Sequence, residues 1–186
     1  MYNWQIAGML SLALVCGGGL AVLLRQPKSA RTTISSHIAT KRHYFIFMAL
    51  LLSFGALPFY GFLLFWLLPT YSLPSITYWV IITAYIAQLL VAWLPAKPKS
   101  PQGRLHAAGG IVVGTSMVAC IWIVALFGQR LGLIASPLIA ITAALSSFTF
   151  IMLLVNLVKP TKLLLILELF MIGSFVLALI ALCWQL

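Results

Sequence analysis

Long runs of apolar residues, separated by short polar segments, cover almost the whole chain. Six runs have the length of a membrane-spanning helix: about 4–24, 44–68, 75–95, 107–128, 132–158 and 163–184. A helix needs about 20 mostly apolar residues to cross the hydrocarbon layer of a bilayer. The runs do not alternate apolar and polar residues, as the strands of a membrane barrel do. The pattern therefore predicts an all-α membrane protein, a single domain built as an antiparallel bundle of six transmembrane helices.

The composition agrees with this pattern. Of the 186 residues, 63% are hydrophobic and 6% are charged, whereas ordinary soluble domains carry about 25% charged residues. This excludes a soluble globular fold, and the high hydrophobicity excludes intrinsic disorder. The first basic side chain, Arg25, follows the first apolar run. Because a cleaved signal peptide begins with its basic region, we expect 4–24 to be a retained span.

The basic residues predict the orientation of the bundle. Ten of the eleven lysines and arginines lie in the segments after the first, third and fifth spans, and only Arg130 lies on the other side. Cytoplasmic loops carry the excess of basic residues in membrane proteins. We therefore expect both termini on the outer, periplasmic side of a bacterial inner membrane, with 25–43 as a cytoplasmic basic loop. Interfacial tryptophans favour the same orientation, since four lie at outer span ends: Trp4, Trp66, Trp79 and Trp184.

The loop 25–43 has an apolar residue at every fourth position, at Ala30, Ile34 and Ile38. This spacing favours a short helix that lies on the inner leaflet. Serine, threonine and proline are also frequent here, so an irregular polar loop is the alternative.

Two features of the spans concern helix packing. Pro58 lies deep in the second span and predicts a kink there, because proline removes one backbone donor. Small residues recur every four positions in the first span, at Ala13, Gly17 and Ala21. Such ridges let helix backbones approach closely, either inside a bundle or against a partner protein.

Glu168 is the only acidic residue of the chain and lies inside the sixth span. An ionisable group within a span is a candidate for function, because burying it unpaired is costly. The alternative is a structural role, in which the carboxylate pairs with a basic residue at the cytoplasmic face. Both interpretations are compatible with the sequence.

No group of residues predicts a catalytic site, a cofactor or a metal centre, and the sequence therefore leans away from an enzyme. The serines of the spans have no histidine at the same depth to act as a base. The cysteines have no C-x-x-C spacing, and the histidines His37, His43 and His106 all lie at the cytoplasmic face. The net charge of +10 fits membrane orientation and anionic headgroups better than nucleic acid.

Two short segments carry a family resemblance. The run Pro-Gln-Gly-Arg-Leu-His at 101–106 resembles the Gly-Arg-(aliphatic)-His helix start of an uncharacterised bacterial family of six-span membrane proteins, which is distantly similar to the eukaryotic DRAM-like membrane proteins. The run Thr-Thr-Ile-Ser-Ser-His at 32–37 resembles a segment between the first two spans of that family. The resemblance implies a six-span layout, and it places this chain's residues on recurrent family positions at Ser35, Gly103, Arg104 and His106.

These two segments would meet at the cytoplasmic face of the membrane. If the loop folds against the start of the fourth span, His37 approaches Arg104 and His106. An arginine can hold a phosphate or a carboxylate by two parallel hydrogen bonds. We therefore expect a pocket for the anionic headgroup of a membrane lipid, formed by these three side chains.

The leading interpretation is a polytopic inner-membrane protein without evident catalysis. It would act as a lipid-contacting protein or as an accessory subunit of a membrane assembly, with lipids and other membrane subunits as its partners. The alternative is a small transporter or channel, which requires polar groups at mid-depth around one cavity. The spans offer five such side chains: Gln88, Thr115, Ser116, Thr142 and Ser146.

Overall fold

The computed structural model describes residues 2–25, 33–38, 41–96, 100–128, 135–158 and 163–183. These residues contain helices and no strand. Six helical segments among them are long and apolar enough to cross a membrane: Asn3–Leu24, Arg42–Thr70, Ile76–Trp93, Pro101–Phe127, Pro137–Asn156 and Leu164–Cys183. The protein is therefore an all-helical chain with the layout of a multi-pass membrane protein.

Five helices of the bundle are continuous: α1 (Tyr2–Leu24), α6 (Ile76–Trp93), α7 (Pro101–Phe127), α8 (Ala135–Val158) and α9 (Leu164–Cys183). The second span is divided into α3 (Arg42–Leu50), the π-helical η1 (Leu51–Gly55), α4 (Leu57–Phe62), the π-helical η2 (Leu63–Leu67) and α5 (Leu68–Thr70). The short helix α2 (Ile34–Ile38) lies in the loop before it.

The helix bounds agree with the predicted spans to within a few residues, except at the start of α7. This helix begins at Pro101, whereas the apolar run predicts a start near residue 107. The Ser100 hydroxyl accepts a hydrogen bond from the backbone N–H of Gly103 at 2.9 Å and caps the helix. A serine cap followed by proline is a strong helix start, so the helix extends beyond the apolar run.

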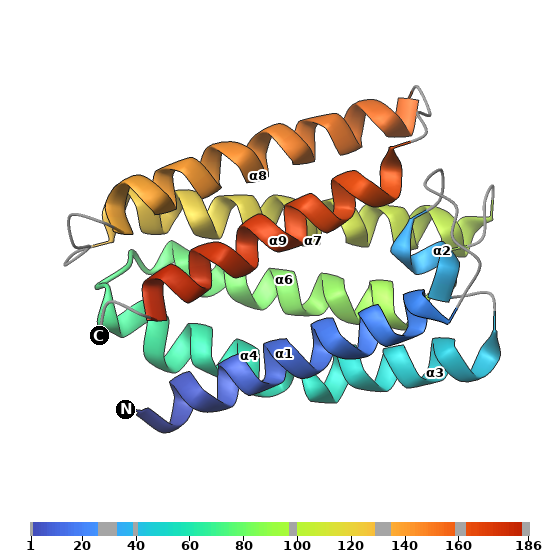
Figure 1. Ribbon diagram of the computed structural model, residues 1–186, viewed down its shortest axis with the longest axis horizontal. Coiled ribbons are helices and arrows are strands. Elements are labelled where there is room, and N and C mark those ends of the chain that lie inside the picture. The colour runs from blue at the N-terminus through green and yellow to red at the C-terminus, as the bar shows by residue number, and fades with distance from the viewer. Residues whose placement is uncertain are drawn as a thin grey trace.

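The helices form two groups that join through α6 and α7 (Figure 1). In one group α1 packs against α4 and α6 contacts η1, while in the other α8 packs between α7 and α9. The start of α1 and the end of α9 lie at the same end of the molecule, and α2 lies at the opposite end (Figure 1).

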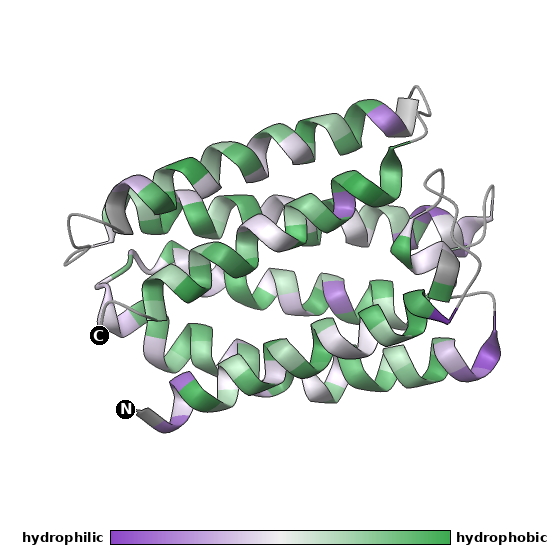
Figure 2. Cartoon of the chain, in the orientation of Figure 1, coloured by the Kyte–Doolittle hydropathy of each residue, from purple (hydrophilic) through white to green (hydrophobic). Residues whose placement is uncertain are grey.

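Apolar side chains cover much of the outside of the bundle. Large exposed residues include Trp79, Leu126 and Phe170, each more than half exposed. Figure 2 shows hydrophobic residues along the lengths of the helices and hydrophilic residues gathered mainly at the ends. Monomeric soluble proteins rarely expose apolar surface of this extent. The surface is the one that a membrane-embedded bundle presents to lipid tails.

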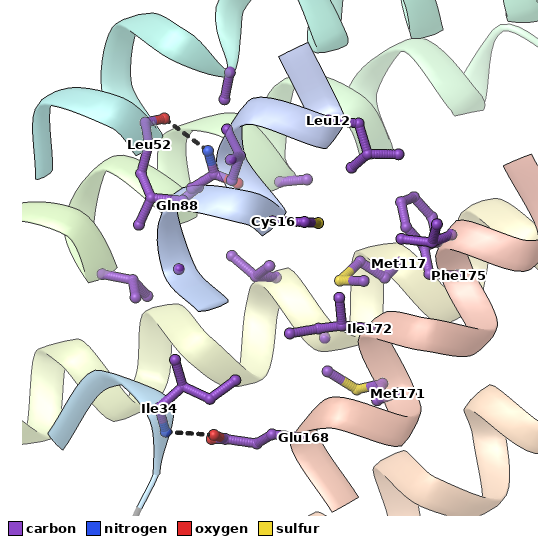
Figure 3. A pocket seen from close by; sticks show the side chains of 18 of the residues that line it. Leu12, Cys16, Ile34, Leu52, Gln88, Met117, Glu168, Met171, Ile172 and Phe175 are labelled. Atoms are coloured by element: carbon purple, nitrogen blue, oxygen red, sulfur yellow. Dashed lines mark hydrogen bonds between the residues drawn. The ribbon is translucent and has the colours of Figure 1, made fainter. Parts of the chain in front are cut away.

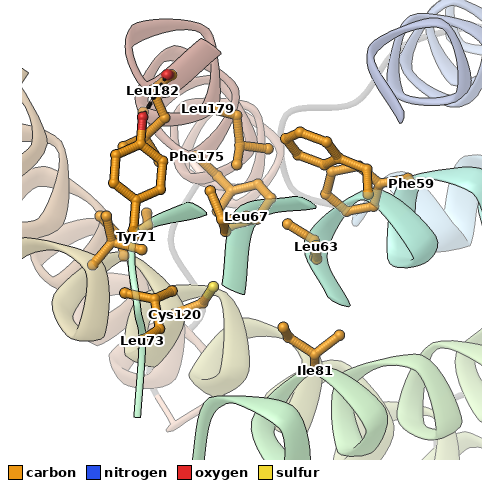
Figure 4. Close-up of a cluster of buried hydrophobic side chains, with 14 of the residues drawn as sticks. Phe59, Leu63, Leu67, Tyr71, Leu73, Ile81, Cys120, Phe175, Leu179 and Leu182 are labelled. Atoms are coloured by element: carbon orange, nitrogen blue, oxygen red, sulfur yellow. Dashed lines mark hydrogen bonds between the residues drawn. The ribbon is translucent and has the colours of Figure 1, made fainter. Parts of the chain in front are cut away.

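The main hydrophobic core lies at the end of the bundle that holds the termini (Figure 4). Phe59, Leu67, Phe175 and Leu182 are among its buried members. Beside them the Tyr71 hydroxyl donates a hydrogen bond to the backbone oxygen of Leu182 at 2.7 Å, which ties the turn after α5 to α9. Burial raises the pKa of Tyr71 to about 12. The hydroxyl therefore keeps its proton and remains a donor at neutral pH.

A second, smaller cluster lies near α2 at the opposite end of the bundle. Its buried members are Val22, Ile38, Met48 and Leu51, from α1, α2, α3 and η1. The short helix α2 is thus attached to the bundle through Ile38, one of the residues of the predicted apolar stripe. The first residue of that stripe, Ala30, lies outside the described residues.

Proline at position 58 coincides with the interruption of the second span. The π-helical η1 ends at Gly55, and α4 begins at Leu57 with Pro58 in its first turn. Side chains from neighbouring helices bind carbonyl groups beside the interruption. Gln88 Nε2 donates to Leu52 O at 2.8 Å, the Tyr85 hydroxyl donates to Ser53 O at 2.8 Å, and the Ser11 hydroxyl donates to Gly55 O. These bonds satisfy backbone groups that would otherwise be costly in an apolar interior.

Helix α1 packs closely against the second span through Gly8 and Gly18, and not through the small residues of the predicted ridge. Ala13, Gly17 and Ala21 are exposed, and a Cβ atom added to Gly17 would meet no atom within 4 Å. A Cβ atom at Gly8 would lie 2.3 Å from Phe62 Cβ, and one at Gly18 would lie 2.5 Å from Leu51 Cδ2. The regular spacing marks one face of α1, but the second span packs on a different face.

Candidate functional site

A cavity of about 750 Å³ lies inside the bundle, between α1 and α9 on one side and α6 and α7 on the other. The end near α2 is bordered by Ile34 and Ile38, and the other end by Phe59 and Phe175 of the main core. Binding sites for small molecules usually have volumes of about 300–1,000 Å³. The cavity therefore has the size of a ligand site.

The walls of the cavity are almost entirely apolar. They include three methionines and two cysteines, whose sulfur atoms are soft, polarizable groups that adapt to irregular apolar ligands. Figure 3 shows several of the wall side chains around this space. Named by helix, the lining includes Leu12, Val15, Cys16, Leu20 and Leu23 of α1, Met117 and Cys120 of α7, and Met171, Ile172, Phe175 and Leu177 of α9.

Two glycines leave part of this space open. Gly110 of α7 and Gly173 of α9 both line the cavity, and a Cβ atom added to either would meet nothing within 4 Å. The cavity also reaches the outer surface of the bundle, because its lining residues Leu20 and Leu177 are 54% and 57% exposed. In a membrane this opening between α1 and α9 faces the lipid tails.

The polar side chain of Gln88 lies on the cavity wall, but the fold uses it. Its Nε2 donates to the carbonyl of Leu52, and its Oε1 accepts from the Tyr60 hydroxyl at 3.0 Å. Figure 3 shows the first of these bonds. Gln88 therefore stabilises the interrupted second span.

Glu168 lies at the cavity end nearest α2 (Figure 3). Its Oε2 atom accepts a hydrogen bond from the backbone N–H of Ile34 at 2.7 Å. Among the described residues, no lysine, arginine or histidine forms an ion pair with it. The structure therefore connects Glu168 to α2 through a backbone N–H group, whereas the structural interpretation predicts a basic residue as its partner.

The predicted headgroup site is described only in part. Arg104 and His106 lie in the first turns of α7, where the Arg104 side chain is exposed. His106 Nδ1 donates to Leu94 O at 2.7 Å and ties α7 to the end of α6. His37 belongs to α2, but its side chain lies outside the described residues. The approach of His37 to Arg104 and His106 therefore stays a prediction.

The five polar side chains of the transporter alternative do not gather around one space. Gln88 and Ser116 line the cavity. The other three form hydrogen bonds elsewhere: Thr115 with the carbonyl of Ile111, Thr142 with the carbonyl of Ile139, and Ser146 with Ser174. These hydroxyls serve local backbone and helix–helix contacts, as polar side chains in membrane bundles commonly do.

Known proteins give no guide to this site: no protein-family model, no curated protein and no solved structure matches the chain. The cavity itself was missed by sequence reasoning, because helical periodicity says nothing of where two helix groups separate. The available signals were a glycine within the sixth span, Gly173, and the lone acid Glu168 near it. Neither signal identifies a cavity without the positions of the neighbouring helices.

Proposed function

We propose that this protein is a lipid-contacting membrane protein that holds the apolar tail of one membrane molecule in the cavity between α1 and α9. The observation that carries the proposal is the apolar cavity of about 750 Å³ with an opening on the lipid-facing surface. An apolar wall without atoms against it forfeits its dispersion contacts. A lipid tail entering from the side restores those contacts without crossing a polar barrier.

The lining favours this function over a transporter with a polar site. The amide of Gln88 forms hydrogen bonds with Leu52 and Tyr60. The hydroxyls of Thr115 and Thr142 bind backbone carbonyl groups of their own helices. A solute-binding site needs convergent polar groups to replace water around a polar substrate. The dry, sulfur-containing wall fits an apolar chain instead.

The orientation and surroundings of the site belong to the same proposal. The excess of basic residues favours an orientation with the α2 end at the cytoplasmic face of a bacterial inner membrane and both termini outside. The exposed guanidinium of Arg104 then lies where it meets anionic headgroups. The likeness of 101–106 and 32–37 to the six-span bacterial family agrees with a role at this face.

A cavity-filling substitution tests the proposal. Gly173→Leu adds a side chain on the cavity wall, and its Cβ atom meets nothing within 4 Å. Gly17→Leu is the matched control: it adds the same side chain to an equally open position that does not line the cavity. Protein in phosphatidylcholine nanodiscs is incubated with a photoreactive fatty alcohol, irradiated and digested, and the labelled peptides are identified by mass spectrometry.

We expect the wild type and Gly17→Leu to be labelled on cavity residues such as Met117 and Met171. In Gly173→Leu this labelling falls at least about fivefold, because the added side chain takes the place of the tail. Labelling of exposed outer residues such as Phe170 stays the same in all three proteins. Equal labelling of the cavity in the wild type and Gly173→Leu contradicts the proposal.

A further inference from the structure

Glu168 supplies the one carboxyl group on the wall of the cavity among the described residues. One of its oxygens, Oε2, is held by the N–H of Ile34 at 2.7 Å. Within the described residues, the other oxygen has no hydrogen-bond partner. A carboxylate offers about four acceptor positions in total, and the described residues occupy one of them.

The bond to Ile34 fixes the carboxylate in place. Ile34 begins α2, and the N–H of Ser36 in the same helix donates to the Thr33 hydroxyl oxygen at 3.1 Å. α2 in turn packs against α1 and α3, and Ile38 is buried there. Glu168 is therefore attached to a packed element and presents its second oxygen at a defined place at the end of the cavity (Figure 3).

We propose that the ligand is a single-tailed amphipath whose head carries a hydrogen-bond donor, an amine or a hydroxyl, bound by the Glu168 carboxylate. The inference rests on the proposed function, since it assumes that the cavity holds an apolar tail. The tail runs from Glu168 past Ile172 toward Phe175, about 10 Å along the helix axis. The head stays at the α2 end, beside Ile34.

The chemistry of the cavity disfavours the other common heads. An ionised fatty acid would meet a second carboxylate in apolar surroundings, so a fatty acid would have to enter as the neutral acid, which costs the free energy of its protonation. An ester or a hydrocarbon end has no donor and would leave the oxygen of Glu168 without a partner, at the cost of an unsatisfied buried acceptor. An amine forms a charged hydrogen bond, and a hydroxyl forms a hydrogen bond to a charged acceptor; both bonds are among the stronger ones.

The test compares four competitors that share one oleyl chain: oleylamine, oleyl alcohol, methyl oleate and sodium oleate. Each displaces the photoreactive fatty alcohol from the full-length protein in phosphatidylcholine nanodiscs. The concentration that halves the labelling of Met171 is measured for the wild type and for Glu168→Gln. Partitioning into the bilayer depends on the lipid and not on the variant, so the ratio between the two proteins reports the contact with residue 168.

For the wild type we expect the amine and the alcohol to compete at least about tenfold better than methyl oleate, which corresponds to one hydrogen bond to a charged group. Glu168→Gln keeps an amide oxygen for the Ile34 N–H and turns an NH₂ group to the cavity. The amine then loses its advantage to within about twofold of methyl oleate, and oleate gains. If only the alcohol or only the amine shows the effect, the head is assigned to that group.

The two proposals fail in different ways. If the four competitors act equally on the wild type, while Gly173→Leu still abolishes labelling, the cavity holds a tail and the assigned head is wrong. If Glu168→Gln leaves the order of the competitors unchanged, Glu168 does not bind the head, and a basic residue of the loop holds its second oxygen instead. If Gly173→Leu has no effect on labelling, the proposed function itself is wrong.

Discussion

The contact between α1 and α4 provides the sharpest test of the helix packing. Gly8 of α1 faces Phe62, and a Cβ atom added there would lie 2.3 Å from Phe62 Cβ and 2.5 Å from Phe62 Cγ. Carbon atoms in contact prefer separations of about 3.5–4.0 Å. The clash involves Cβ, which no rotamer change can move, and Phe62 is 0% exposed. Gly8→Ala therefore forces the two helices apart by about 1 Å.

The energetic effect has two parts. Overpacking of a tight interior costs about 1–3 kcal/mol. We use about 3 kcal/mol for Gly8→Ala, because the clash is with Phe62 Cβ, which no side-chain rotation can move. Alanine in a helix is favoured over glycine by about 1 kcal/mol, so Gly8→Ala loses about 2 kcal/mol in total. Gly17→Ala, in the same helix, meets nothing within 4 Å and gains up to about 1 kcal/mol. The two variants should differ by about 3 kcal/mol.

Unfolding in detergent can be followed with a thiol-reactive fluorescent dye in a background that keeps Cys120 and lacks Cys16 and Cys183, because Cys120 is buried and the other two are partly exposed. A difference of about 3 kcal/mol corresponds to roughly 6–12 °C in Tm for a chain of this size. We expect Gly8→Ala to unfold below the wild type and Gly17→Ala at or above it. If the two variants melt within about 2 °C of one another, α1 does not pack on α4 through Gly8.

Two other predictions concern the membrane. With both termini outside, a Ser72→Cys variant in a cysteine-free background should react with an impermeant reagent on intact cells, and Ser100→Cys should not; the reverse pattern would overturn the orientation read from the basic residues. Arg104→Ala should lower the retention of anionic lipid in native mass spectrometry more than Arg130→Ala does, since each cation near the surface contributes about 1 kcal/mol to anionic-lipid attraction. Arg130 lies outside the described residues and is predicted to be on the opposite face of the membrane. Equal lipid loss from both variants would contradict the prediction of a headgroup site at the cytoplasmic face.

The positions of the spans could be predicted closely because hydrocarbon thickness sets the length of an apolar helix. The predicted 163–184 and the observed Leu164–Cys183 differ by one residue at each end. The start of α7 was missed because capping by Ser100 is a local hydrogen bond, independent of hydropathy. The interruption near Pro58 was predictable from the missing donor, but the bonds from Gln88 and Tyr85 that satisfy the carbonyls there were not.

The candidate site was less accessible to sequence reasoning. Glu168 was singled out as the only acid, and its depth in the span predicted a partner at the cytoplasmic face, without saying from which segment. Its partner was expected to be a cation, whereas the partner described is the backbone N–H of Ile34. Every residue except proline carries such an N–H group, and only the position of α2 decides which one reaches the carboxylate.

The sequence by itself determined the class of the protein, its six spans and the excess of basic residues on one side. These follow from the solvent: a bilayer demands apolar length and internally bonded backbone from each segment separately. The tertiary structure decided which faces of the helices meet. Lipid tails are as apolar as the side chains, so hydropathy does not distinguish an inward from an outward face. That is why Gly8 proved to be a packing contact, Gly17 an exposed position and Gly173 part of a cavity wall.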